Sequence, residues 1–553
     1  MKNREKVTIA QLILATMIPI SSLIAVDAHR ERPNFLFIII DDLRPVLGAY
    51  GDAKAHTPNI DLLARQSVVF ERAYAQQALC SPSRNSLLTS RRPDDIGLYD
   101  FSSHWAGVAC NLTTLPKYLK NNGYVTSGFG KVFHPGVPMN KSCDHRDSWS
   151  EPPFYPSTEK YKDAPVCRQG NSTPDSNLIC PVRVSEMPNA TLPDLEILQA
   201  AKEFLNKQRR EPFFLAVGFH KPHIPLKYPK KYLKFHPLKK FSLPRNYEWL
   251  ENVSNVAYNP WTDLRRRSDV RKLGLNCPWE KIPEKFAIKI IQSYYAAVTY
   301  IDELIGKLLR KIDNLKIRGE TIVILTSDHG WSLGEHAVWS KYSNFEVAVR
   351  VPLIISVPHL THLWKDSTKF DFNNRTQRNV FNNHAEGQPV ELLDIFPTVA
   401  ELAGFPIPTC PEENTATPRF CTMGSSLIPL ITASTKTKSR SVNRTAISQY
   451  PRPGVDPVCN PSSDKPRLRQ ISVMGYTIRT VQYRYTAWVN FSQVVKLPIW
   501  QSILAEELYD HYTDSSESSN LASIQVFQHI KYTLKLMLME KLKQRLNGAN
   551  NIS

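Results

Sequence analysis

Asn34-Phe35-Leu36-Phe37-Ile38-Ile39-Ile40-Asp41-Asp42 is the stretch of sequence that decides the fold. A continuous apolar run of this kind is typical of a central strand in a parallel sheet that is covered on both faces. Ligands of open α/β sheets sit at the carboxyl ends of such strands, and this strand ends in two carboxylates. Asp41 and Asp42 would repel each other there unless a cation neutralised them, although they could equally cap the next turn.

The same pattern recurs along the chain. Residues 321–327 form another buried-strand pattern, which ends at Asp328 and His329. Strand patterns at 124–129 and 212–218 are also followed by polar side chains, which are Lys131, His134, His220 and His223. Each of these residues alone is more often a surface or core side chain than a ligand. Four strand ends that carry such groups together predict one site at the carboxyl edge of the sheet.

Helical periodicity appears between these strands, at residues 59–70, 195–208 and 290–314. Because helices alternate with buried strands, we expect an α/β fold. Its core should be a large, mostly parallel central sheet with helices on both faces.

A Ser-, Thr-, Lys- and Arg-rich run at 432–442 predicts a domain boundary. The sequence beyond it contains strand patterns and a basic amphipathic helix at 526–546, so we expect a smaller C-terminal α+β domain. The predicted domains are a catalytic domain over 29–436 and the smaller domain over 437–553.

The first 28 residues combine basic residues, an apolar run and small residues before the expected cleavage point, which predicts a secretory signal peptide over 1–28. No later run reaches the ~18 apolar residues that span a bilayer, so we expect no stable membrane insertion. Asn-X-Ser/Thr sequons favour a glycoprotein. They begin at Asn111, Asn140, Asn171, Asn189, Asn252, Asn374, Asn443, Asn490 and Asn551.

The formal net charge of the chain is +18. A basic balance suits an anionic partner, which could be nucleic acid, a membrane surface or an acidic polymer. Because the signal peptide routes the chain into the secretory pathway, we expect no nucleic-acid partner and favour an acidic polysaccharide. A solvated basic surface without a specific partner is the alternative.

The stretch Cys80-Ser81-Pro82-Ser83-Arg84 resembles the signature of the type I sulfatases, in the alkaline-phosphatase-like superfamily. In that family the cysteine is oxidised to formylglycine, whose hydrated aldehyde, a gem-diol, attacks the sulfur of a sulfate ester. Ser90 departs from the pattern, since glycine is usual there. The resemblance extends over nearly the whole chain after the signal peptide. It rests further on the motifs at 41–45, 130–136, 220–225, 328–336, 339–345 and 483–486.

The resemblance implies one divalent cation, with calcium expected. Its ligands would be Asp41, Asp42, Asp328, His329 and an oxygen of modified Cys80. Calcium prefers oxygen ligands, so a histidine in this set is unusual and leaves the identity of the metal open.

The resemblance also implies catalytic roles for cationic side chains. Arg84 and Lys131 would hold and polarise the hydrated aldehyde, and Lys341 and His223 would bind the sulfate oxygens. His223, together with Lys341, would protonate the departing sugar oxygen. His134 would help to deprotonate the second hydroxyl, which then expels sulfate.

Within the family, the likeness is greatest to lysosomal enzymes of glycosaminoglycan breakdown. It implies hydrolysis of the 2-sulfate ester of terminal L-iduronate in heparan sulfate and dermatan sulfate, with Trp331, Lys341 and Tyr342 as candidates for substrate recognition. The implied partners are sulfated chain ends and, during biosynthesis, the formylglycine-generating enzyme. The implied location is the lysosome, reached through the secretory pathway, with some enzyme secreted.

Three other functions remain open. The chain could be a sulfatase of other specificity, or a phosphatase or phosphonate hydrolase of the same superfamily. It could also be a non-catalytic glycosaminoglycan-binding glycoprotein.

Eight of the nine cysteines remain if Cys80 is modified, and an even number suits an oxidising compartment. Cys167 with Cys180, and Cys410 with Cys421, each enclose a short loop and are predicted disulfides. The pairing of the other four stays open. These are Cys110, Cys143, Cys277 and Cys459.

Overall fold

The computed structural model describes residues 32–103, 112–134, 145–168, 173–361, 384–385, 387–405, 407, 409–410, 421–434 and 443–543. The predicted signal peptide, the predicted boundary at 436/437 and two of the cysteines, Cys110 and Cys143, lie outside the described residues. Five sequons also lie outside them, at Asn111, Asn140, Asn171, Asn374 and Asn551. Among the described residues, no helix has the length and apolarity that crossing a membrane requires.

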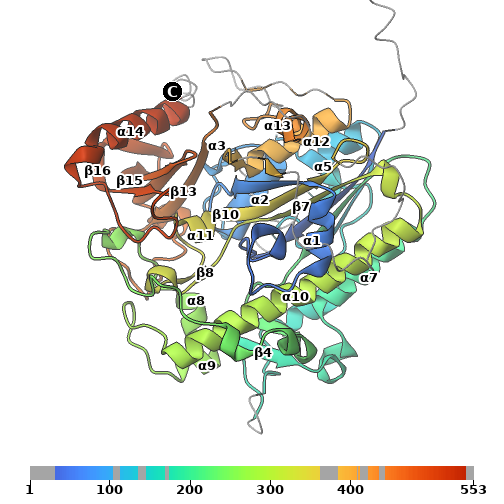
Figure 1. Cartoon of the computed structure of the whole chain (residues 1–553), viewed down its shortest axis with the longest axis horizontal. Coiled ribbons are helices and arrows are strands. Elements are labelled where there is room, and N and C mark those ends of the chain that lie inside the picture. The colour runs from blue at the N-terminus through green and yellow to red at the C-terminus, as the bar shows by residue number, and fades with distance from the viewer. Residues whose placement is uncertain are drawn as a thin grey trace, which may run out of the picture.

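An eight-stranded sheet forms the centre of the molecule (Figure 1). Its strand order is β11-β2-β10-β7-β1-β5-β3, with β12 also paired to β2. Strands β7, β1, β5 and β3 are parallel to one another, whereas β10 runs antiparallel to both β7 and β2. The strands are β1 (Asn34–Ile40), β2 (Val68–Tyr74), β3 (Val125–Gly130), β5 (Phe213–Phe219), β7 (Thr321–Ser327), β10 (Arg350–Ser356), β11 (His384–Ala385) and β12 (Val390–Glu391).

Strand β1 is buried on both faces, as its sequence predicts. Leu36, Ile38 and Ile40 point into one hydrophobic core, which helices α1 (Pro58–Arg65), α7 (Pro193–Asn206) and α10 (Glu284–Asn314) also form. The intervening residues Phe35, Phe37 and Ile39 point into a second core. Its helices are α2 (Cys80–Thr89), α5 (Leu115–Asn121) and α12 (Ile395–Leu402). The predicted α/β fold with a sheet covered on both faces is therefore confirmed.

The helix expected over 59–70 is wrong in its second half. Helix α1 ends at Arg65, and residues 68–74 form β2, which pairs with β10 near the edge of the sheet. The run Val68-Val69-Phe70 continues the apolar pattern of the helix, so periodicity alone could not separate the two. β-branched residues favour a strand, and pairing with β10 decides the outcome.

The chain from Ala446 onward forms a second, antiparallel sheet with the order β13-β14-β15-β16. Helix α14 (Gln528–Lys543) covers it and buries Leu534, Leu538 and Leu542. The amphipathic helix of the sequence analysis thus packs on its own sheet. The four strands are β13 (Ala446–Arg452), β14 (Val473–Arg479), β15 (Tyr483–Ser492) and β16 (Leu497–Asp510).

Shorter elements lie around the two sheets. The helices are α3 (Pro93–Ile96), α6 (His145–Ser148), α8 (Thr262–Arg265), α9 (Ser268–Arg271), α11 (Glu346–Val349) and α13 (Ile428–Ser434). The strands are β4 (Ile179–Val182), β6 (Leu226–Pro229), β8 (Ser332–Leu333) and β9 (Trp339–Ser340).

Disulfides join Cys167 to Cys180 and Cys410 to Cys421. A third joins Cys277 to Cys459, which ties the segment before α10 to the chain that follows β13. Cys80 is a free, buried cysteine. Of the described sequons, Asn189, Asn252 and Asn443 are exposed. Asn490 is half-buried, and its Nδ2 donates a hydrogen bond to Ser502.

Ser90 follows the last turn of α2 in the left-handed backbone region, with φ 53° and ψ 38°. Glycine adopts this conformation without a steric cost, which accounts for its use there in the family that the sequence resembles. In this chain the serine side chain makes two compensating bonds. Its Oγ donates to the carbonyl of Leu393 at 2.7 Å and accepts from the amide of Gly424 at 3.0 Å.

We expect Ser90→Ala to lower the free energy of unfolding by about 2 kcal/mol, because the left-handed strain remains and two buried backbone groups lose their partner. Ser90→Gly should cost less than about 1 kcal/mol, because relief of the strain offsets the lost bonds. Urea unfolding of both variants measures the difference. Equal stability of the two variants would contradict this account.

Candidate active site

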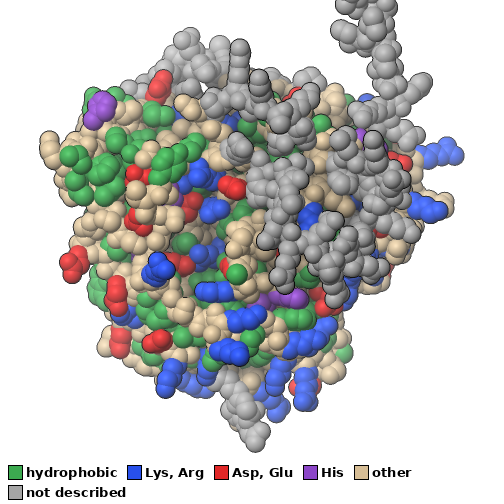
Figure 2. All heavy atoms as spheres, in the orientation of Figure 1, with side chains coloured by type: hydrophobic (Ala, Val, Ile, Leu, Met, Phe, Trp, Pro, Cys, Tyr) green, Lys and Arg blue, Asp and Glu red, His purple; other side chains and the backbone are tan. Residues whose placement is uncertain are grey.

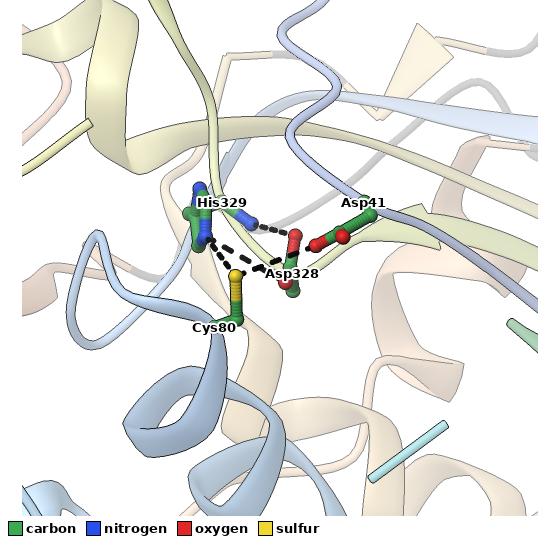
Figure 3. Close-up of side chains that lie close together, drawn as sticks. All are labelled: Asp41, Cys80, Asp328 and His329. Atoms are coloured by element: carbon green, nitrogen blue, oxygen red, sulfur yellow. Dashed lines mark hydrogen bonds and ion pairs between the residues drawn. The ribbon is translucent and has the colours of Figure 1, made fainter. Parts of the chain in front are cut away.

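Four neighbouring parallel strands deliver the predicted side chains to one edge of the central sheet. β1 is followed by Asp41 and Asp42, β3 by Lys131, and β7 by Asp328 and His329. β5 leads into the loop that carries His223. Helix α2 begins at this edge, and its first residue, Cys80, points toward Asp41, Asp328 and His329 (Figure 3).

Cys80 lies at the centre of this group and is fully buried. Its Sγ is 3.1 Å from Lys341 Nζ, 3.3 Å from His329 Nε2, and 3.4 Å from both Asp41 Oδ1 and Lys131 Nζ. Burial, with a further contribution from Asp41, raises the pKa of the Cys80 thiol to about 12 despite the two lysines. Because the thiolate is the nucleophilic form, the unmodified cysteine is a poor nucleophile in the cation-free site.

The carboxylates around Cys80 fit a divalent cation. Ligand atoms of Asp41, Cys80, Asp328 and His329 all lie within 4.8 Å of one another. Asp42 Oδ2 is buried and has no hydrogen-bond partner in the described part of the chain. Burial and the charges of Asp41 and Asp328 raise the pKa of Asp42 to about 7, although Lys341 opposes the shift.

The histidine of this group is oriented as a ligand. His329 Nδ1 lies 2.9 Å from the carbonyl oxygen of Gly330, so Nδ1 carries the proton. The lone pair of Nε2 then faces Asp42 and Asp328, at 3.4 and 3.6 Å. This arrangement is typical of metal-binding histidines. Hard carboxylates with one neutral imidazole suit a divalent cation, without selecting calcium over others.

Arg84 contacts the carboxylates rather than Cys80. Its Nε donates to Asp328 Oδ2 at 2.9 Å and its Nη2 to Asp41 Oδ1 at 3.1 Å. Its Nη1 donates to the carbonyls of Lys131 and Val132, so one guanidinium joins the ends of β1, β3 and β7. None of the hydrogen bonds of Arg84 in the described structure reaches Cys80. The expected hold of Arg84 on the hydrated aldehyde stays a prediction.

Lys131 and Lys341 each lie between a carboxylate and the sulfur. Lys131 Nζ donates to Asp41 Oδ2 and Lys341 Nζ to Asp42 Oδ1, both at 2.6 Å. Burial alone would lower the pKa of each ammonium. Asp41 nevertheless raises the pKa of Lys131 above its usual value, and Asp42 raises the pKa of Lys341 well above its usual value. Both lysines therefore keep a full positive charge next to Cys80.

The two candidate acid–base histidines are neutral in the free protein. Burial, followed by the charges of Lys162 and Lys341, holds the pKa of His223 well below its usual value. His223 Nδ1 lies 2.6 Å from the Ile224 carbonyl, and Nε2 lies 4.0 Å from Asp42 Oδ2. Burial and Lys131 also hold the pKa of His134 well below its usual value.

The residues suggested for substrate recognition flank Lys341. Its Nζ lies 5.7 Å from the ring centroid of Trp331 and 6.0 Å from that of Tyr342, and both rings are buried. The Tyr342 hydroxyl donates to Asp263 at 2.6 Å. Lys465, which sequence reasoning missed, places its Nζ 5.3 Å from the same ring.

The C-terminal sheet holds the segment that carries Lys341. Arg452 donates to the carbonyl of Tyr342 at 2.7 Å, and Arg484 donates to the carbonyl of Asn344. The carboxylate of Glu517 accepts from the amide of Glu346 at 2.9 Å. These partners are more than a hundred residues from Lys341 in sequence, and no local pattern could have identified them.

The chain matches the family model described as sulfatase over residues 33–405. The chain belongs to the sulfatase family. It is 45% identical to iduronate 2-sulfatase of Mus musculus over 515 residues, which cover 89% of this chain and 93% of the relative. It is 44% identical to iduronate 2-sulfatase of Homo sapiens over 507 residues, with 88% and 90% covered. The family assignment from the sequence is therefore confirmed, and with it the class of sulfuric ester hydrolase.

Solved structures support the same fold. A protein in complex with its substrate D-glucosamine-2-N,6-O-disulfate has a TM-score of 0.65 at 20% identity, covering 95% of this chain and 100% of the other. A phosphonate monoester hydrolase from Silicibacter pomeroyi has a TM-score of 0.66 at 20% identity, with 93% and 96% covered. At this identity the similarity concerns the fold alone.

Proposed function

We propose that this sulfatase removes the 2-sulfate of terminal L-iduronate in heparan sulfate and dermatan sulfate. The observation that carries the proposal is the 44–45% identity to two iduronate 2-sulfatases across about nine-tenths of the chain. The site is consistent with it, because a free, buried Cys80 lies within 3.4 Å of two charged lysines. Two ammonium groups at this position suit a sulfate ester beside a uronate carboxylate.

Two groups would complete the site. A divalent cation, for which we propose Ca²⁺, would be held by Asp41, Asp42, Asp328 and His329, and would supply positive charge that polarises a bound oxygen. Formylglycine formed from Cys80 would supply the oxygen nucleophile as its hydrated aldehyde. The remaining chemistry falls to side chains of the chain itself.

Lys131 and Lys341 stabilise negative charge at the position of Cys80 Sγ. Their ammonium groups are fixed by Asp41 and Asp42 at 2.6 Å, so they need no rearrangement as charge develops. Arg84 acts indirectly on the position of Cys80, because it orients Asp41 and Asp328. This pre-organised charge would contribute to the rate without a cost of reorganisation during the reaction.

His223 and His134 move protons in this proposal. His134 is neutral, because burial and Lys131 hold its pKa well below its usual value, and it would accept a proton only as negative charge develops beside it. His223 must first gain a proton to protonate the sugar oxygen. A sulfate and a carboxylate bound nearby would raise its pKa, because they offset the effect of Lys162 and Lys341. The acid would thus form when the substrate is in place.

We also propose a biological setting from the sequence. The chain would enter the secretory pathway, receive formylglycine from the formylglycine-generating enzyme, carry glycans and act in the lysosome on sulfated chain ends. The boundary between its domains would fall at 436/437. Trp331 and Tyr342 would contribute by orienting Lys341, with which they are in cation–π range.

Cation binding should depend on pH in a defined direction. The pKa of Asp42 is raised to about 7 in the cation-free site, whereas an unfolded aspartate titrates near 3.8. Between these values the folded state binds more protons than the unfolded state, so the stability of the cation-free protein falls as pH rises through this window. A cation must displace the proton below about pH 7.

We therefore expect the apparent Kd for Ca²⁺ to rise by up to about tenfold per pH unit from pH 7 to pH 5, with release of about one proton. Isothermal titration calorimetry in buffers of different ionisation enthalpy measures both quantities. Asp42→Asn should remove this pH dependence as well as weakening binding. An affinity that is constant over this range would contradict the assignment of Asp42 as a ligand.

A substrate panel tests the proposed function. Protein from a host that installs formylglycine should release sulfate from a disaccharide with terminal 2-sulfated L-iduronate. It should be much less active on 6-sulfated glucosamine and on aryl phosphate. Preference for 6-sulfated glucosamine would indicate a sulfatase of other specificity. Preference for the phosphate would favour a phosphatase, and inactivity on every ester would favour a binding protein.

A further inference from the structure

Basic residues are concentrated in the segment that leads from β5 past His223, and its lysines and arginine are not among the catalytic residues. Between Glu211 and Glu248 the sequence contains eight Lys and Arg residues and no Asp or Glu. Lys221 and Lys227 are buried. The other six are exposed, and we call them the basic surface. They are Lys230, Lys231, Lys234, Lys239, Lys240 and Arg245.

Aromatic residues fix the basic surface against α10. The segment includes the short 3₁₀ helices η7 (Lys230–Phe235) and η8 (Leu238–Lys240). Tyr232 packs on Tyr300 with ring centroids 5.5 Å apart, and Phe241 packs on Tyr295 at 5.1 Å. His236 Nε2 lies 2.7 Å from the hydroxyl of Thr299. Because these contacts order the backbone, the lysines are presented on a rigid support, which lowers the entropic cost of binding.

The charges of the basic surface are mostly not neutralised. Only Lys231 has a carboxylate partner in the described structure, Glu303 at 3.5 Å, and that carboxylate lies closer to Lys307, at 2.8 Å. Exposed lysines elsewhere are often paired, as in Lys207 with Glu151 and Lys272 with Asp175.

Helix α10 adds positive charge beside the basic surface. Gln292 Nε2 donates to the carbonyl of His236, and the exposed Lys289 lies on the same face of α10, three residues earlier. Lys and Arg side chains gather on the lower part of the face shown in Figure 2, over α10. The local field of this region is therefore positive and open to solvent.

The basic surface is connected to the catalytic site by a short piece of chain. Lys230 follows His223 by seven residues, so the two Cα atoms are at most about 25 Å apart. Strand β6 occupies most of that interval. β6 itself is buried, so this bound concerns the distance alone, and a linear polymer with one end near His223 is long enough to reach the basic surface.

We propose that the basic surface is an exosite, a binding surface outside the catalytic pocket, for the sulfated polysaccharide whose terminal sugar is desulfated. The partner named here rests on the proposed function. Repeated sulfates and carboxylates along a glycosaminoglycan complement a row of ammonium groups. Lysines suit this use because they act as point charges without a fixed binding geometry. The surface raises the local concentration of long chains and leaves the chemistry of the site unchanged.

The test compares two quadruple variants that remove equal charge. The first carries Lys230→Gln, Lys234→Gln, Lys239→Gln and Lys240→Gln. The control carries Lys202→Gln, Arg210→Gln, Lys535→Gln and Lys541→Gln, which lie in α7, just after it and in α14, outside the segment that forms the basic surface. Binding to immobilised heparin is measured as the salt concentration at elution, and kcat/KM is measured on long heparan sulfate chains and on a terminal disaccharide.

We expect the first variant to elute at lower salt than the wild type and to lose about tenfold in kcat/KM on long chains, the low end of electrostatic effects on association. Its kcat/KM on the disaccharide should stay within about twofold, and the control variant should match the wild type. If both variants lost kcat/KM on long chains equally, or if the first variant lost none, the exosite would be overturned. Inactivity of the wild type on both substrates would count against the proposed function instead, and heparin elution would still decide the exosite.

Discussion

Cys80→Ala is expected to abolish sulfate release, with a loss in kcat of about 10⁴-fold or more, the range seen when a covalent nucleophile is removed. Cys80 is fully buried and its raised pKa disfavours the thiolate, which is why the proposed function assigns the nucleophile to the modified form of this residue. Among the described residues, the side chains within hydrogen-bond distance of its Sγ belong to Lys341, His329, Asp41 and Lys131, and none of them carries a hydroxyl that could replace it.

Ser86→Ala is the matched control for this variant. Ser86 lies in the same helix, and its buried hydroxyl has no hydrogen-bond partner in the described structure. We expect this control to keep its activity within about twofold, and both variants to unfold within about 1–2 kcal/mol of the wild type. Residual activity of Cys80→Ala above one part in a hundred would contradict the role of Cys80.

Lys341→Met is expected to lower kcat by about 10²–10³-fold, as the loss of a fixed group that stabilises developing negative charge does in other enzymes. The ammonium lies 3.1 Å from Cys80 Sγ and is held at 2.6 Å by Asp42. Its loss also leaves Asp42 buried without its cationic partner, so the cation-free protein should lose about 3–5 kcal/mol of stability.

Divalent cation should restore much of that stability but not the rate. Steady-state kinetics and urea unfolding, each with and without Ca²⁺, separate the two effects. Lys160→Met is the control, since Lys160 is exposed and contacts only the ring of Tyr161 among the interactions described. A Lys341→Met variant with normal kcat and weaker substrate binding alone would assign Lys341 to binding rather than to catalysis.

The fold could be predicted from sequence where the signal is carried by long buried runs. The run that ends at Asp41 and the run that ends at Asp328 are both central parallel strands, and their carboxyl ends meet. Because parallel strands share one edge, the sequence also indicated that Lys131 and His223 would join them. Strand β2 was missed because its apolar pattern continues that of α1.

The site could be predicted only as far as residue identity. Sequence reasoning brought Arg84 to the site, but its actual partners, Asp41 and Asp328, depend on how the start of α2 faces β1 and β7. The contacts of Arg452 and Arg484 with the segment after Lys341 depend on docking of the C-terminal sheet. Such long-range contacts leave no periodic signal in the sequence.

For the basic surface, the sequence reveals the charge, and the structure is needed to show how that charge is presented. The run of lysines between Lys230 and Lys240 is evident in the sequence, but charge runs are often simply solvated. The structure adds that Tyr232 and Phe241 pack on α10. It also adds that, among the residues described, a carboxylate opposes only Lys231 of these lysines.

The most direct test of the account is to measure, in one set of preparations, the fraction of Cys80 converted to formylglycine and the specific activity on 2-sulfated L-iduronate. Peptide mass mapping across Cys80 distinguishes the thiol from the aldehyde, and hosts with different levels of the modifying enzyme provide a range of conversion. The account predicts that activity rises in proportion to conversion and vanishes when every Cys80 is an intact thiol. Full activity in a preparation whose Cys80 is unmodified would contradict it.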